Sequence, residues 1–160
     1  MPGWGEVVRE APELAAAVQA RFDANRHKVL GTLRADGSPR LSGIEVTFRD
    51  GELWLGMMPD SRKALDLRRD ARMALHSATV DPDLVEGDAR VTGRAVEVTG
   101  AGAMEALVEG DARFEGGAPP GHVFRVDVTE VMLISIGDPA DHLVIDSWRD
   151  GRGVQRIERR

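Results

Sequence analysis

Two Asp-Gly pairs, at residues 36–37 and 50–51, divide the early part of the chain into short segments whose side chains alternate in polarity. Asp and Gly accept the positive φ angles of the tight turns that join antiparallel strands. The segments at residues 28–34, 40–49 and 52–58 are therefore predicted to be consecutive antiparallel strands. Parallel neighbours are excluded here, because they need a long crossover connection.

The rest of the chain continues this pattern. Further strands are predicted at residues 71–77, 88–99, 122–128, 131–136 and 142–148, and helices at residues 12–24, 61–70 and 101–109. Such an order indicates a mainly β fold, a closed or nearly closed antiparallel barrel of about six to seven strands with peripheral helices. A single domain over residues 1–160 is expected, since domains commonly run to about 100–150 residues. It comprises an N-terminal helix at 12–24, a barrel at about 27–148 and a basic tail at 149–160.

Composition excludes several classes of site and partner. The chain has no cysteine, which excludes disulfides, a thiolate nucleophile and zinc sites built on sulfur. The formal net charge of −6 disfavours nucleic acid as a partner, because that binding depends on neutralising phosphates. There is no apolar run long enough for a membrane helix and no signal-peptide pattern. A cytoplasmic protein with no membrane or nucleic-acid partner is expected.

The segment Ser61-Arg62-Lys63 follows a predicted strand and opens a predicted helix. Unpaired N–H groups and the positive end of the helix dipole make a helix start favourable for phosphate. Cations are disfavoured in a first turn unless an anion lies beside them, so Arg62 and Lys63 indicate a bound phosphate there. Arg62 can make a forked contact, and Lys63 supplies a point charge. A capped surface helix with solvated cations is the alternative interpretation.

Four motifs together resemble one family. They are Gly31-Thr32-Leu33, Asp36-Gly37-Ser38-Pro39-Arg40, Ser61-Arg62-Lys63 and Leu67-Arg68-Arg69-Asp70-Ala71-Arg72. In this combination the chain is similar to the pyridoxamine 5′-phosphate oxidase-like split-barrel proteins, which include FMN-binding and deazaflavin (coenzyme F420)-binding oxidoreductases. The resemblance covers about residues 20–100, with a weaker echo at Trp148.

This resemblance implies an antiparallel split β-barrel that forms a homodimer, with cofactors in grooves at the subunit interface. It implies that the cofactor phosphate is held by three residues: Ser61, Arg62 and Lys63. The ribityl chain and flavin edge would lie along Ser42, Gly43, Ile44 and Glu45, and the ring system against Gly56 and Met57.

The resemblance also implies contributions from later parts of the chain. Asp88 matches a position that can touch the flavin from the partner subunit. Trp148 resembles an aromatic residue of the family's C-terminal strand, and Arg152 or Arg156 is expected to reach the phosphate from there.

Three departures argue against a vitamin B6 enzyme. Ser42 stands where pyridoxamine phosphate oxidases have an arginine, and Gly56-Met57 stands where they have a tyrosine–threonine pair. Their substrate-binding arginine–histidine pair has no clear counterpart after Trp148. The glycine at position 56 is expected to leave more room over the ring.

Two other motifs are weak. Gly100-Ala101-Gly102 resembles the start of a dinucleotide fingerprint, but Glu105 stands in place of the third glycine. The four histidines have no pair at close metal-ligand spacing, so no metal site is predicted.

The sequence therefore predicts a flavin-dependent oxidoreductase that binds FMN and transfers hydride between NAD(P)H and a small organic substrate. No side chain is identified as catalytic, which suits chemistry carried by a cofactor ring. Two alternatives stay open: an F420-dependent reductase on the same fold, and a non-catalytic protein that binds or stores flavin or haem.

Overall fold

The computed structural model describes residues 2–160. Its helices are α1 (Trp4–Glu10), α2 (Pro12–Asp23), α3 (Arg62–Arg69), α4 (Ala103–Val108) and the 3₁₀ helix η1 (Ala112–Phe114). Its strands are β1 (Lys28–Leu33), β2 (Pro39–Ile44), β3 (Val46–Arg49), β4 (Glu52–Met57), β5 (Arg72–His76), β6 (Asp88–Glu97), β7 (His122–Ile136), β8 (Leu143–Arg149) and β9 (Gly153–Arg159).

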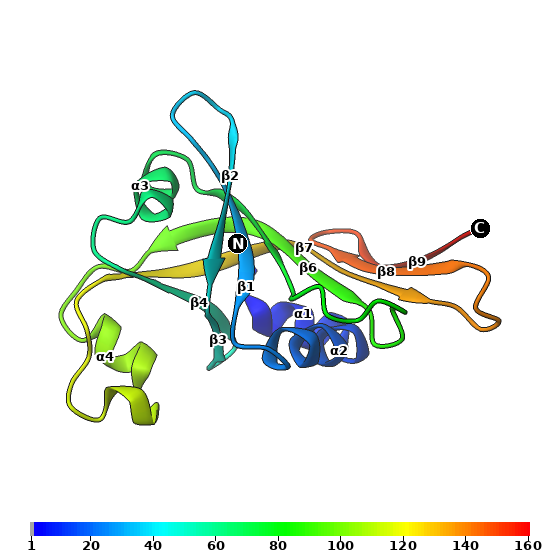
Figure 1. Cartoon of the computed structure of the whole chain (residues 1–160), viewed down its shortest axis with the longest axis horizontal. Coiled ribbons are helices and arrows are strands. Elements are labelled where there is room, and N and C mark those ends of the chain that lie inside the picture. Colours follow the sequence, from blue (N-terminus) through cyan, green and yellow to red (C-terminus); the bar gives the residue numbers. More distant parts are fainter. Residues whose placement is uncertain (1) are drawn as a thin grey trace.

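All nine strands belong to one strongly curled antiparallel sheet (Figure 1). The strand order is β2-β1-β5-β6-β7-β4-β3, and β8 continues from β7 and carries β9. Helices α1 and α2 lie together below the sheet, whereas α3 lies beside the β1–β2 hairpin at the opposite side of the picture. The predicted mainly β, single-domain split-barrel class is confirmed.

Both Asp-Gly pairs form the predicted hairpin turns. Gly37 has a φ of 83° and ends a three-residue loop in which its N–H donates to the carbonyl of Arg34, at 2.9 Å. Asp50 and Gly51 both have positive φ, 52° and 74°, as the mirror-image turn of a two-residue hairpin requires. These turns fix the register of β1 against β2 and of β3 against β4.

The segment expected to be one strand at residues 40–49 changes partner at Glu45. Before that residue β2 pairs with β1, and after it β3 pairs with β4. Conversely, the two strands expected at residues 122–136 form the single strand β7, which pairs with β4 and β6 first and with β6 and β8 later. A bulge opposite Thr92 and Gly93 lets β7 bend without ending.

The C-terminal residues expected to be a basic tail form strand β9 instead. A third Asp-Gly pair, Asp150-Gly151, turns the chain back so that β9 pairs with β8 along its whole length. The Arg156 guanidinium donates to the Asp146 carboxylate across the two strands, at 2.7 Å. Arg156 and Arg159 thus lie on an exposed strand, and the β8–β9 hairpin extends away from the barrel (Figure 1).

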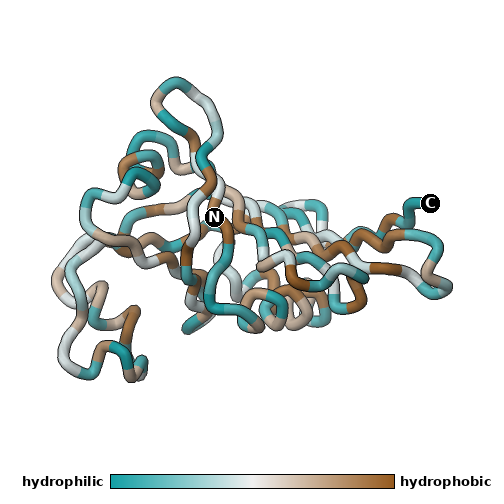
Figure 2. Tube along the Cα trace, viewed as in Figure 1, coloured by the Kyte–Doolittle hydropathy of each residue, from teal (hydrophilic) through white to brown (hydrophobic). Residues whose placement is uncertain are grey.

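The core lies between the sheet and the N-terminal helices. Helix α2 matches the predicted helix, and the preceding α1 was not predicted; its Trp4 and Val7 are buried. The rings of Trp4 and Phe48 lie 4.7 Å apart, and Phe22 packs on the same ring of Phe48. Apolar residues alternate with polar ones along the central strands (Figure 2). Among residues 2–160 there is no helix with the length and apolarity needed to span a membrane.

Candidate functional site

Helix α3 begins after a tight turn at the end of β4. The turn runs from Met58 to Ser61, whose N–H donates to the Met58 carbonyl at 3.3 Å. Asp60 has a φ of 54°. Because Pro59 holds its own φ negative, a positive φ at the next residue makes this a type II turn. The turn delivers Ser61 to the N-cap position of α3.

The Ser61 hydroxyl is a buried polar group without a partner. Its side chain makes no cap hydrogen bond to the helix, and within the described residues its Oγ atom has no hydrogen-bond partner of any kind. A buried hydroxyl is normally hydrogen-bonded, so this atom marks a place where an additional acceptor or donor fits.

Two cations follow in the first turn of α3, which contains no acidic residue. The ammonium of Lys63 donates to the Gly43 carbonyl on β2, at 2.7 Å, and burial lowers the pKa of Lys63. Arg62 is exposed, and its guanidinium makes no hydrogen bond or ion pair within residues 2–160. The structure therefore brings residues 61–63 beside the β2 segment that was predicted to line the same site.

A buried carboxylate fixes α3 against the first hairpin. Asp66 accepts hydrogen bonds from Thr32 at 2.8 Å, from Arg40 at 2.7 Å and from Arg69 at 3.0 Å. Burial raises the pKa of Asp66, but the hydrogen bonds from Arg40, Thr32 and Arg69 outweigh burial and leave this pKa below its ordinary value. This contact explains why the predicted hairpin motif and the predicted helix meet.

The outer side of the same helix is held by a second network. Arg68 makes a forked ion pair with Glu97 at the end of β6, with distances of 2.7 and 2.9 Å. Glu97 also contacts Nδ1 of His122 at 2.9 Å, and Nε2 of His122 accepts the N–H of Asp60 at 3.0 Å. The turn before Ser61 is thus in contact with the first residue of β7.

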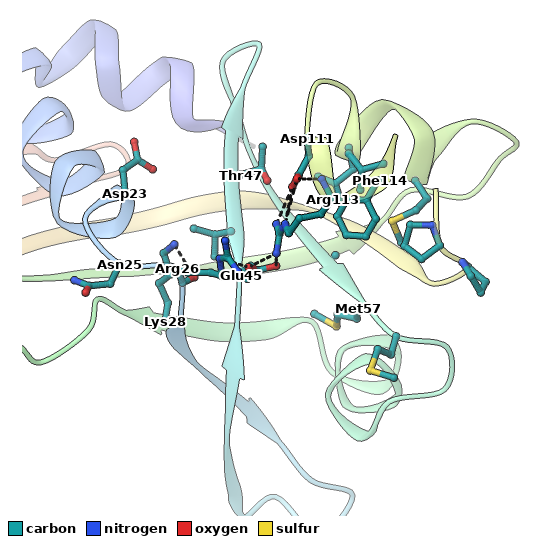
Figure 3. A pocket seen from close by; sticks show the side chains of 18 residues that line it. Asp23, Asn25, Arg26, Lys28, Glu45, Thr47, Met57, Asp111, Arg113 and Phe114 are labelled. Carbon is teal, nitrogen blue, oxygen red and sulfur yellow. Dashed lines mark hydrogen bonds and ion pairs between the residues drawn. The ribbon is translucent and has the colours of Figure 1, made fainter. Parts of the chain in front are cut away.

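A cleft of about 570 Å³ lies between β3–β4 and the segment that carries α4 and η1 (Figure 3). One part of its wall is apolar and the other is charged. The apolar part includes Met57, Met58, Met104, Leu107 and Phe114. The charged part includes Arg26, Lys28, Glu45, Asp111 and Arg113.

The cleft's outer segment is tied to the barrel by ion pairs. Arg113 donates to Glu45 at 2.9 Å and to Asp111 at 2.7 Å, and Arg26 lies 3.5 Å from Glu45 (Figure 3). Arg49 donates to the carbonyl of Glu109 at 2.7 Å. Sequence reasoning missed Arg113, because it is 68 residues from its partner and lies in a Gly- and Pro-rich stretch that has no local motif.

The space over Gly56 is not open, contrary to the expectation from sequence. A Cβ atom at this position would lie 2.7 Å from Cδ2 of Leu107, so α4 packs directly on the glycine. The chain also passes closely at Gly121, where a Cβ atom would lie 2.2 Å from the carbonyl oxygen of Met57. The two glycines allow the segment with α4 and η1 to pack on β4, and the cleft lies beside them.

Most of the predicted site residues lie along this path, from the start of α3 to the cleft. Ser42 is half-buried and Gly43 exposed on β2, the side chain of Ile44 is in the core, and Glu45, Gly56 and Met57 line the cleft. Three predicted residues lie elsewhere.

Trp148 is fully buried, and its indole N–H donates to Glu10 at 2.7 Å, so its side chain belongs to the core of this chain. Asp88 begins β6 at the end opposite Glu97, and Arg152 is exposed in the β8–β9 turn. Contributions of Asp88 and Arg152 to a site on a second subunit stay predictions.

Comparison with solved structures gives the same fold. PhzG from Burkholderia lata 383, determined in complex with tetrahydrophenazine-1-carboxylic acid, is similar with a TM-score of 0.67 and 15% identity, covering 98% of this chain and 93% of that one. The conserved hypothetical protein Rv2991 from Mycobacterium tuberculosis has a TM-score of 0.58 and 24% identity, with 71% and 79% covered. HupZ from Group A Streptococcus has a TM-score of 0.61 and 13% identity, with 76% and 94% covered.

The sequence comparisons identify a family but no individual curated relative. No curated protein matches the chain. The family model described as pyridoxamine 5′-phosphate oxidase matches residues 14–135, from α2 to the second half of β7. This range contains the first hairpin, all of α3 and the cleft, and it is well over half of the chain. The chain therefore belongs to the pyridoxamine 5′-phosphate oxidase family.

Proposed function

We propose that this protein is a flavin-dependent oxidoreductase subunit that binds FMN, with the phosphate at the start of α3 and the ring system in the adjoining cleft. The observation that carries the proposal is the buried, unpartnered hydroxyl of Ser61 at a helix start that also presents two cations. A phosphate there satisfies the hydroxyl, accepts from the first N–H groups of α3 and neutralises Arg62 and Lys63.

The cleft has the size and character of a site for a planar, partly polar ring. Its volume of about 570 Å³ lies within the usual range for small-molecule sites, about 300–1,000 Å³. Met57 and Leu107 supply apolar contacts, and Glu45 and Arg113 close the polar end. A bound flavin supplies two-electron transfer chemistry, while these side chains orient the ring and exclude water from it.

The neighbouring arginines favour FMN over coenzyme F420. An acidic cofactor tail would need free cations beyond the phosphate site. Arg68 is bound to Glu97, and Arg69 is bound to Asp66 and to the carbonyl of Leu33, so both are already neutralised within the subunit. Arg62 and Lys63 match the single phosphate of FMN.

The proposed assembly is a homodimer. Large apolar side chains are exposed on the elements that carry the proposed phosphate site: Leu41 on β2 at 76%, Met58 in the turn before α3 at 77%, and Leu65 on α3 at 40%. A second copy of the chain over these elements would cover them and complete a groove around the cofactor. Sedimentation equilibrium of the purified protein tests this: a dimer supports the proposal and a monomer contradicts it.

The phosphate site is tested by titrating the protein with FMN and with riboflavin, which lacks the phosphate, while following flavin fluorescence. Replacing both Arg62 and Lys63 with alanine is expected to weaken FMN binding roughly 100-fold, about 2.7 kcal/mol. Riboflavin affinity is expected to stay unchanged, because the ring contacts are intact.

The matched control removes two exposed cations elsewhere. Arg9→Ala with Arg160→Ala takes the same charge from α1 and from the C-terminus, where the side chains are 68% and 69% exposed. This control is expected to keep the FMN affinity of the parent protein. Equal weakening in both double variants would mean that only net charge matters and would contradict a site at α3. Anaerobic addition of NAD(P)H then tests the proposed electron donor: reduction of the bound flavin supports an NAD(P)H-dependent oxidoreductase, and a flavin that stays oxidised contradicts it.

A further inference from the structure

Lysine is rare in this chain, which has two lysines among its 21 lysine and arginine residues. One is Lys63, in the proposed phosphate site. The other, Lys28, is the first residue of β1 and alternates with Leu30 and Thr32 on the buried face of that strand. A core-facing position of a strand normally holds an apolar side chain, and departures from this pattern are expected at functional sites.

The Lys28 side chain is buried and borders the cleft. The residue is 6% exposed, and it lines the cleft beside the loop that joins α2 to β1 (Figure 3). Its ammonium donates to the carbonyl of Arg26 at 2.9 Å, which is the one hydrogen bond it makes within residues 2–160. An ammonium has three N–H donors, so two of them are available to a ligand.

The two arginines of the cleft wall are already paired with carboxylates. Arg113 donates to Glu45 at 2.9 Å and to Asp111 at 2.7 Å. Arg26 lies 3.5 Å from the same carboxylate of Glu45. These two cations and two anions neutralise one another, so neither arginine needs a further counter-charge.

Lys28 lacks such a partner. Burial lowers the pKa of Lys28, and the carboxylates of Asp23 and Glu45 oppose this effect from a distance without forming an ion pair with it. Asp23 is exposed, so water and salt screen its charge. A buried charge without a paired opposite charge is costly, and an anion bound at this end of the cleft would offset the cost.

Strand pairing places Lys28 close to the wall of the cleft that is proposed to contact the flavin. Lys28 pairs with Ile44 of β2. Two residues later, Val46 pairs with Leu55 of β4, the residue before Gly56. Because residues are about 3.3 Å apart along a strand and strands about 4.8 Å apart, the long lysine side chain and a small organic substrate can together span this distance.

We propose that Lys28 binds a carboxylate group of the substrate at the polar end of the cleft, while the rest of the substrate lies against the flavin ring beside Met57. Two free N–H donors suit the two oxygens of a carboxylate, and one negative charge matches one unpaired ammonium. A phosphate monoester would bring nearly two negative charges, and the arginines that could balance the second are engaged. The inference rests on the proposed function, because it names the substrate class for the same cleft.

The test compares benzoate with benzamide, which share a ring and differ in charge, on the FMN-loaded protein. Binding is followed by the change in flavin absorbance. The parent is expected to bind benzoate more tightly than benzamide. Lys28→Met keeps the length of the side chain and removes the ammonium, so it is expected to weaken benzoate binding about tenfold and to leave benzamide binding unchanged.

The matched control is the other lysine. Lys63→Met is expected to weaken FMN binding and, once the protein is saturated with FMN, to bind benzoate like the parent. Lys28→Met is expected to show the reverse, with the FMN affinity of the parent. A parent that binds both probes equally, or a Lys28→Met variant that keeps the benzoate affinity, overturns the proposal.

The Lys28→Met variant is expected to fold at least as stably as the parent in thermal unfolding, because it removes an unpaired buried charge. Lower stability together with unchanged benzoate binding would mean that the ammonium serves only to hold the Arg26 carbonyl, and the proposal would be wrong.

A second measurement uses the parent alone and keeps the two proposals separable. With lysine isotopically labelled, NMR shows two ε-carbon signals, since the chain has two lysines. Benzoate is expected to shift the Lys28 signal in the flavin-free and in the FMN-loaded protein, and benzamide is expected to leave it in place. A Lys28 signal that ignores benzoate in both forms overturns the carboxylate site. If Lys28 responds to benzoate but no FMN binds, the proposed function fails and the carboxylate site stands.

Discussion

At the scale of single residues, Asp66 does most to place the candidate site. Its side chain is 4% exposed and receives one hydroxyl and two guanidinium groups from three different elements. Removing a buried charge leaves its partners without compensation, which is more destabilising than the loss of one hydrogen bond. The position of α3 on the barrel therefore depends on this carboxylate.

We predict that Asp66→Asn lowers the free energy of unfolding by about 2 kcal/mol at neutral pH, measured by urea denaturation. The pKa of Asp66 is below its ordinary value, so its contribution is complete at neutral pH and is lost as pH falls below about 4. The difference between parent and variant is therefore expected to shrink in acid.

The control for this prediction is Asp70→Asn. Asp70 also bonds an arginine, Arg72, which lowers the pKa of Asp70 to about 2, but the Arg72 side chain is 66% exposed. An exposed ion pair contributes little to stability, so this variant is expected to unfold like the parent at neutral pH. If Asp70→Asn destabilises as much as Asp66→Asn, burial of the carboxylate does not explain its effect.

Ser61 gives a prediction of opposite sign for stability and for binding. An N-cap serine replaced by alanine usually costs about 0.5–2 kcal/mol, because a cap hydrogen bond is lost. Ser61 makes no such bond, and its hydroxyl is buried without a partner. Ser61→Ala is therefore expected to leave thermal stability of the ligand-free protein unchanged or raised while it weakens FMN binding. If Ser61→Ala lowers thermal stability but leaves FMN affinity unchanged, the hydroxyl serves only to cap α3, and the prediction is wrong.

At the scale of elements, the segment with α4 and η1 is attached to the barrel by close backbone approach. At Gly121 the approach is to a backbone oxygen, that of Met57, which is fixed in the ladder between β4 and β7. A flexible side chain could move aside, but this oxygen cannot move without breaking the ladder. The shape of the cleft therefore depends on a glycine that contributes no side chain to it.

We predict that Gly121→Ala destabilises the protein by about 1–3 kcal/mol and weakens flavin binding, because the added methyl group overpacks against Met57. Thermal unfolding and flavin titration measure the two effects. Gly116→Ala is the matched control in the same segment, since its Cβ atom would contact nothing within 4 Å. Equal effects of the two substitutions would mean that flexibility of the segment, and not close approach, is what the glycines supply.

Short sequence patterns predicted those elements that depend only on neighbouring residues. The Asp-Gly turns predicted both early hairpins, and a four-residue apolar period predicted α2. The change of partner at Glu45 and the continuity of β7 were not predictable in this way, because each depends on strands distant in sequence. Strand β9 was missed because an exposed strand with mostly polar side chains has no apolar alternation.

At the scale of the whole molecule, some parts of the candidate site come from one short stretch of sequence, and others come from residues far apart in the chain. The cations and hydroxyl of residues 61–63 form one local motif, and the sequence predicted them as a group. The contacts of Arg113 with Glu45 and of His122 with Asp60 join residues 68 and 62 positions apart, so only the folded chain brings them together. Trp148 was assigned to the cofactor by resemblance alone, whereas the structure buries its side chain in the core.

The most direct measurement is a crystal structure of the protein grown with FMN. The account predicts phosphate density at the start of α3, within hydrogen-bond distance of the Ser61 hydroxyl and of the Arg62 and Lys63 side chains, with the ring in the cleft beside Met57. A phosphate bound elsewhere, with the Ser61 hydroxyl still unpartnered, would contradict it.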